Sequence, residues 1–197
     1  MKESNKQCMC PTRNKIIKSA EMLFSKYGYA SVSMDDIAKE VEITKAALYY
    51  HFDGKEKLFL EMMVDEFAKF EKLLSDNLEG EGGSSDRLKQ FIINYINFSL
   101  EERNFAKIII QKFSPREKDI LKLIVGGRDR MIEKVEPFIK NILRERGFDG
   151  KCDSYFMSFM LMGVLHNVIA NELIFQTHKW SAEHIAEQIL ILMPVER

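Results

Sequence analysis

Proline and glycine are scarce in this chain, with four and ten respectively among 197 residues. Long apolar segments therefore run with few breaks, which favours helices over strands. No segment shows the strict apolar–polar alternation of a strand, and no internal repeat is visible. The sequence predicts an all-α protein of about nine helices.

Cysteine is also scarce. Cys8, Cys10 and Cys152 are too few for a disulfide framework. Cys8 and Cys10 lie close enough to bind a thiophilic metal or to sense oxidants, but a zinc site normally needs four ligands and none cluster nearby. We expect no metal and no cofactor.

The apolar runs are expected to fall short of the roughly 18 uncharged residues that a membrane-spanning helix needs. The first residues lack the apolar core of a signal peptide, so we expect a cytoplasmic protein. No glycine-rich phosphate loop, HExxH pair or nucleophile elbow occurs, and the four histidines are scattered. These absences argue against an enzyme.

Charge is nearly balanced, with a net charge of −1, so the total does not indicate a nucleic-acid partner. Its distribution is uneven, because residues 1–18 hold several cations against Glu3 alone: Lys2, Lys6, Arg13, Lys15 and Lys18. A flexible basic arm at residues 1–10 could reach DNA phosphates. A solvated tail without a role fits the same residues.

The segment from Ser33 to Lys57 has the pattern of a helix-turn-helix. Ser33 is placed to cap a helix, and Asp36 completes a capping box. Glu42 and the next residue make a turn, and Thr44 caps a second, very short helix that cannot be stable alone. Such an arrangement presents one small helix to a DNA groove.

Residues 13–62 resemble the N-terminal domain of the tetracycline-repressor (TetR) family of transcription regulators. The resemblance rests on these motifs: Phe24-x-x-Tyr27-Gly28-Tyr29, Ser33-x-x-x-Ile37-Ala38, Thr44-Lys45-x-x-Leu48-Tyr49-Tyr50-His51-Phe52 and Lys55-Glu56-x-Leu58. One departure is Glu42, because the family usually has glycine in this turn. Glycine is favoured where φ is positive, so either Glu42 adopts that conformation at some strain or the turn differs.

Eight residues are candidate DNA contacts. Lys45 can reach a guanine edge or a phosphate, and the tyrosines offer flat rings with polar tips. Small Ala46 lets a partner approach closely, and the start of the helix after Ser33 suits a phosphate. The resemblance adds Lys55, because in the family the lysine that opens the fourth helix commonly meets the backbone. The full set is Ser33, Thr44, Lys45, Ala46, Tyr49, Tyr50, His51 and Lys55.

The remaining chain, residues 55–197, is predicted to bind an effector and to form a dimer, while residues 11–54 form the DNA-binding domain. An apolar cavity between helices could be lined by the following residues, although for each residue taken alone a well-packed core is the better interpretation: Phe91, Tyr95, Phe98, Phe105, Ile109, Phe113, Tyr155, Phe159 and Met162. No cluster of arginine or lysine falls in these stripes. We therefore expect a neutral, apolar or weakly cationic small molecule rather than a strongly anionic one.

The last two helices look too apolar for a monomer surface and are candidates for a homodimer interface. The candidate residues are Leu161, Gly163, Val164, Leu165, Val168, Ile185, Ile189 and Leu192. The resemblance implies a dimer that reads a palindromic double-stranded DNA operator and, most often, represses until its effector binds. An activator, or a helical scaffold with a vestigial DNA-binding head, remains an alternative.

Helix ends in the second half are predicted from local signals. Ser114 and Pro115 form a strong helix start, with serine as the N-cap and proline at the first helical position. That helix is expected to run to about Arg146, with a bend or a break at Gly126–Gly127 or at Pro137.

Overall fold

A computed structural model describes residues 11–78, 82–177 and 180–193. Helices make up nearly all of this part and no strand occurs in it, so the all-α prediction is confirmed. The chain divides into two compact units, Met1–Met63 and Val64–Arg197. This division falls inside one long helix, beyond the boundary at residue 55 that the sequence suggested. Cys8, Cys10 and the basic arm lie outside the described residues.

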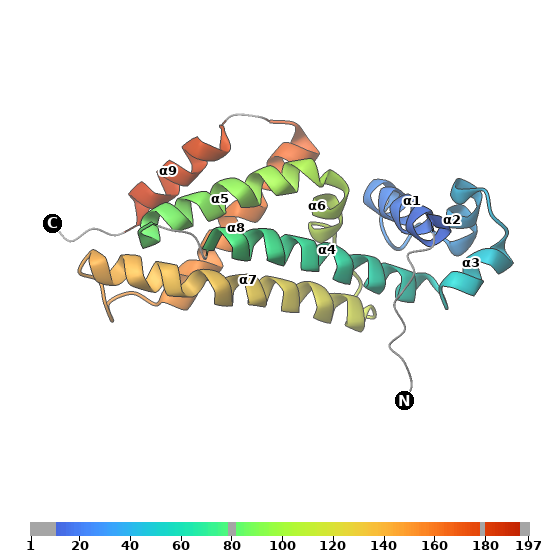
Figure 1. Cartoon of the computed structure of the whole chain (residues 1–197), viewed down its shortest axis with the longest axis horizontal. Coiled ribbons are helices and arrows are strands. Elements are labelled where there is room, and N and C mark those ends of the chain that lie inside the picture. The colour runs from blue at the N-terminus through green and yellow to red at the C-terminus, as the bar shows by residue number, and fades with distance from the viewer. Residues whose placement is uncertain (1–10, 79–81, 178–179, 194–197) are drawn as a thin grey trace. The chain divides into compact units, whose positions relative to one another are not determined.

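The first unit contains α1 (Pro11–Tyr27), α2 (Met34–Val41), α3 (Lys45–His51) and the start of α4 (Lys55–Leu78) (Figure 1). Phe24, Tyr29 and Phe59 meet in edge-to-face or tilted ring contacts with centroids 4.8–5.6 Å apart. Leu48 and Phe52 are buried in the same core, as the helical spacing predicts. These contacts stabilise the two short helices, which are too short to persist alone.

Side-chain caps fix where the two short helices begin. The Ser33 hydroxyl accepts from the backbone N–H of Asp36, and the Asp36 carboxylate accepts from the backbone N–H of Ser33 at 2.9 Å. The predicted capping box is therefore present. Thr44 Oγ1 likewise accepts from the backbone N–H of Ala47 at 3.1 Å, which confirms the second cap.

The second unit contains the rest of α4 with α5 (Ser84–Glu101), α6 (Arg103–Ile109), α7 (Lys118–Glu145), α8 (Ser154–Ala170), a π-helical turn (Asn171–Phe175) and α9 (Ala182–Leu192). In Figure 1, α4, α5 and α7 run alongside one another. The most extensive pairings are α7 with α8 and α5 with α9. The core lies between α4, α5, α7 and the inward side of α8.

The start predicted for α7 is wrong, and the structure shows no break within it. The helix begins at Lys118, because Ser114 and Glu117 form a separate turn in which the Glu117 backbone N–H donates to the Ser114 carbonyl. The helix also continues through Gly126–Gly127 and Pro137 without a break. Gly127 serves close packing here, since a Cβ at this position would lie 2.5 Å from the Phe67 ring.

One stretch, Ser154–Phe175, is long and apolar enough by length and composition to cross a membrane, which corrects the expectation that no such stretch exists. A helix in a protein core or a subunit interface meets the same criteria. Leu161, Met162 and Leu165 are buried on its inward side, whereas Phe156 and Met160 are exposed on another side. The helix is apolar on its buried side and on its exposed side, which is why its composition resembles that of a membrane-spanning helix.

Candidate nucleic-acid interface and apolar cavity

The turn between α2 and α3 depends on a left-handed residue. Glu42 has φ 61° and ψ 41°, and the backbone N–H of Ile43 donates to the Ala38 carbonyl at 3.0 Å. Of the two possibilities, Glu42 thus adopts the glycine-like conformation. For a residue with a side chain this costs about 1–2 kcal/mol, which the surrounding contacts must offset.

The outward side of α3 presents aromatic rings. Tyr50 is 87% exposed and Tyr49 is 44% exposed, whereas Leu48 of the same helix is fully buried. The Tyr50 and His51 rings meet edge to face with centroids 5.4 Å apart. Thr44, Lys45 and Ala46 are also exposed at the start of the helix. Five candidate contacts therefore share an accessible short helix, and His51 is half-buried at its end.

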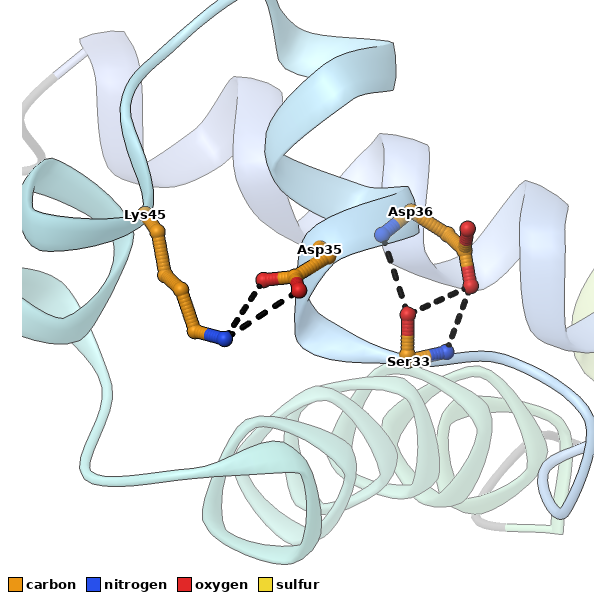
Figure 2. Close-up of polar contacts among 4 residues, drawn as sticks. All are labelled: Ser33, Asp35, Asp36 and Lys45. Carbon is orange, nitrogen blue, oxygen red and sulfur yellow. Dashed lines mark hydrogen bonds and ion pairs between the residues drawn. The ribbon is translucent and has the colours of Figure 1, made fainter.

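An ion pair ties α3 to α2. Figure 2 shows the Lys45 ammonium facing the Asp35 carboxylate, with Nζ 2.8 Å from Oδ1 and 3.1 Å from Oδ2. The Asp35 carboxylate raises the pKa of Lys45 through this hydrogen bond and its charge. The predicted DNA-reading cation is thus already paired with an anion. The sequence alone does not show this pairing, because it depends on how the two helices cross.

Lys55 lies at the start of α4, and its ammonium is directed into its own unit. Lys55 Nζ donates to the carbonyls of Tyr29 at 2.8 Å and Val32 at 2.9 Å, and it lies 4.3 Å from the centre of the Tyr29 ring. These contacts hold the connection between α1 and α2. Ser33, in contrast, is exposed at the start of α2, and its hydroxyl interacts with Asp36 (Figure 2).

The second unit encloses an apolar cavity of about 220 Å³. Of the nine residues proposed for such a cavity, four line it: Tyr95, Phe105, Ile109 and Met162. The other five lie elsewhere. Phe91 is packed in the core, and Phe98 stacks on Phe70 with centroids 5.0 Å apart. Phe113 is half-buried beyond α6, and Tyr155 and Phe159 are exposed on α8.

Twelve of the sixteen lining residues were not predicted from the sequence, among them Gly127, Arg128 and His166. Burial lowers the pKa of His166, and the nearby Arg128 charge lowers it further. Burial also raises the pKa of the Tyr95 hydroxyl. The histidine is therefore neutral and the tyrosine protonated at pH 7. The signal that could have found Arg128 is the helical spacing of the apolar residues of α7, because Arg128 lies three residues before the buried Met131.

The proposed dimer residues separate into two groups. Gly163, Val164 and Leu192 are exposed and Val168 and Ile189 half-buried, whereas Leu161, Leu165 and Ile185 are buried within the unit. Further exposed apolar residues, absent from the proposal, extend the α8 surface: Tyr155, Phe156, Phe159 and Met160. Among the described residues, no group of three or more His, Cys, Asp or Glu is arranged to hold a metal ion.

These features define a class: an all-helical protein with an N-terminal helix-turn-helix and a larger helical unit that contains a cavity. Residues 16–62 match the model of the bacterial regulatory proteins of the tetR family. The N-terminal helix-turn-helix of the chain thus matches that family's DNA-binding domain over these residues.

A curated relative agrees with this assignment. The "Biofilm operon icaADBC HTH-type negative transcriptional regulator IcaR" of Staphylococcus aureus is 37% identical over 105 residues, which cover 53% of this chain and 56% of that protein. The match thus spans about half the length of the relative.

Solved structures match most of the chain. FadR from Bacillus subtilis in complex with stearoyl-CoA has a TM-score of 0.73 at 14% identity, covering 91% of this chain and 96% of that one. AibR in complex with isovaleryl coenzyme A and operator DNA has a TM-score of 0.73 at 19% identity, covering 94% and 100%. At these identities the likeness establishes the fold.

Proposed function

We propose that this protein is a cytoplasmic homodimeric DNA-binding transcription regulator. The observation that carries the proposal is the exposed surface of α3, where Tyr49, Tyr50 and Lys45 lie on a helix that is capped and buried on its other side. Such a helix suits insertion into the major groove. IcaR is described as a negative regulator, and by analogy we propose a repressor.

The dimer proposal rests on exposed apolar residues of the second unit. Phe156, Met160 and Val164 recur at helical spacing on α8, and Leu192 is 81% exposed on α9. Exposed apolar residues that follow one another along a helix favour an association site. In a two-fold dimer, two recognition helices about 34–36 Å apart would match a palindromic operator.

DNA binding is tested by fluorescence anisotropy with the DNA upstream of the gene and a random duplex of equal length, at moderate salt. We expect a clear preference for the upstream DNA. Tyr50→Ala should weaken operator binding at least tenfold, whereas Tyr27→Ala, an exposed tyrosine on α1, serves as the control. Equal affinity for both duplexes would overturn the regulator proposal and favour the scaffold alternative.

The oligomeric state is tested by sedimentation velocity. Val164→Glu should produce monomers, because it places a charge in the proposed apolar interface. Val64→Glu, at another exposed valine, should leave the dimer intact. A wild-type protein that remains a monomer at micromolar concentration would contradict the proposed dimer.

The cavity of about 220 Å³ suits a small, mainly apolar effector that releases the DNA. An effector shifts operator affinity only by its differential affinity for two conformations. Transcription from the upstream promoter, with and without this gene, distinguishes repression from activation. Lower transcription in the absence of the gene would show that the regulator activates.

A further inference from the structure

The cavity in the second unit has mostly apolar walls, with polar side chains on one part of its surface. Phe67, Phe70 and Phe105 form much of the apolar wall. The Ser99 hydroxyl, also in the wall, donates to the Tyr95 carbonyl at 2.8 Å. The other polar residues of the wall are Tyr95, Arg128 on α7 and His166 on α8.

Tyr95 and His166 both line the cavity, and each carries a polar group that can hydrogen-bond to a bound molecule. Tyr95 is only 4% exposed, and the two rings lie with centroids 6.2 Å apart. Polar groups at such depth are normally paired, because leaving them unpaired costs free energy. A molecule bound in this cavity can therefore pair with both groups.

Arg128 gives this part of the cavity positive charge. Its Nε and Nη2 both donate to Asp129 Oδ1, at 3.1 and 2.9 Å, and its guanidinium lies 5.5 Å from the centre of the Phe159 ring. A guanidinium has five N–H donors, so this contact does not exhaust them. A cation, a protonated phenol and a neutral imidazole together favour an acceptor that carries one negative charge.

The size of the cavity limits the apolar part of such a ligand. A dry apolar cavity of about 150 Å³ can hold a molecule the size of benzene. A cavity of about 220 Å³ therefore accepts a body of that size with a small head group.

We propose that the cavity binds a small apolar monocarboxylate, with the carboxylate against Arg128 and the Tyr95 hydroxyl and the hydrocarbon part among the phenylalanines. This deepens the proposed effector function and rests on it for any consequence at the operator. The single negative charge departs from the sequence-based expectation of a neutral, apolar or weakly cationic effector, because Arg128 lines the cavity.

The test uses three probes of one chain length: octanoate, 1-octanol and octylamine. Isothermal titration calorimetry on the purified full chain at pH 7.5 should show octanoate binding at least tenfold more tightly than the other two, since charge-assisted hydrogen bonds are the strong ones. Equal affinities for octanoate and octanol, or no binding of any probe, would overturn the proposal.

Variants locate the head group. Arg128→Gln should weaken octanoate binding about tenfold or more and leave octanol binding unchanged, and Tyr95→Phe should weaken octanoate binding selectively by a smaller factor. Arg130→Gln is the matched control, because Arg130 lies on the same helix and pairs with Glu71 at 2.6 Å without lining the cavity. Equal losses in both arginine variants would contradict the assignment.

Calorimetry needs no DNA, so the proposed ligand site and the proposed regulator function are tested independently of each other. Selective octanoate binding with no effect on operator affinity would support the site and refute its role as an effector site. Operator binding that persists while octanoate does not bind would refute the site alone. Circular dichroism of each variant verifies that it is folded, and Tyr95→Phe provides the test if Arg128→Gln is not.

Discussion

The ion pair between Lys45 and Asp35 predicts that the DNA-binding unit restrains its own cation. Before Lys45 can contact a phosphate or a base, its ammonium must leave a carboxylate 2.8 Å away (Figure 2). Both side chains are largely exposed, so solvent and salt screen the pair and it adds little to stability. Its main effect should therefore be on DNA binding.

Asp35→Asn should strengthen binding to DNA of any sequence, because it removes an anion next to the interface and releases Lys45. One additional phosphate contact steepens the dependence of log affinity on log salt by about 0.9. A contact of this kind corresponds to a gain of roughly threefold to tenfold near 0.1 M salt. The measurement is anisotropy titration from about 50 to 200 mM salt, with operator and random duplexes.

Glu40→Gln is the control, since it makes the same change of charge on α2, where Glu40 acts on Lys26 instead of Lys45. If the two variants change affinity and salt slope equally, the general charge of α2 explains the effect and the reasoning from the ion pair is refuted. An unchanged salt slope in Asp35→Asn would refute it as well.

Three further changes test the local structure. Gly127→Ala should lower the free energy of unfolding by about 1–3 kcal/mol, because its Cβ would meet the buried Phe67 ring at 2.5 Å; urea unfolding measures this. Glu42→Gly should raise the free energy of unfolding by up to about 1 kcal/mol. It removes the strain of the left-handed conformation, and the greater conformational freedom of glycine in the unfolded chain offsets part of that gain. Ser33→Ala should cost about 1 kcal/mol through loss of the cap. Hydrogen bonds from Ser33 lower the pKa of Asp36 below its ordinary value of 3.8. Their interaction therefore stabilises the folded state above pH 3.8 and is lost as the pH falls through the lower pKa of the folded state. The loss of stability caused by Ser33→Ala should accordingly be smaller at pH 2.5 than at pH 7 when unfolding is measured at both.

Each of these has a control on the same element. Gly126→Ala should be neutral or stabilising, because the nearest atom to its Cβ is Arg130 Nη1 at 3.5 Å and alanine favours a helix. Glu42→Gln removes the charge and keeps the strain, so a gain as large as that of Glu42→Gly would argue for charge. A Ser33→Ala effect that is equal at both pH values would contradict the coupling to Asp36.

The first unit could be read from the sequence because its signals are local. Ser33, Asp36 and Thr44 sit at fixed spacings from the helices they cap, and the structure contains both caps. Glu42 was identified as the residue at the left-handed position, although the sequence could not decide whether it would adopt it. The partner of Lys45 was out of reach, because it depends on how α2 and α3 cross.

The second unit was harder because α8 is apolar around most of its circumference. Periodicity assigns a side only where one side is polar. On α8 that signal is absent, so Phe159 was assigned inward and is exposed, while Leu161 was assigned outward and is buried. The orientation of such a helix is decided by its neighbours α5 and α7, which the sequence does not reveal.

This two-sided character bears on the regulator proposal. Met162 and His166 line the cavity from one side of α8, and Phe159 and Val164 are exposed on another. A ligand that contacts His166 therefore touches the helix that would carry the partner subunit. Any displacement of α8 by the ligand would act on the dimer directly. Coupling of this kind requires that the ligand prefer one packing of α8, since a ligand that binds both packings equally shifts neither.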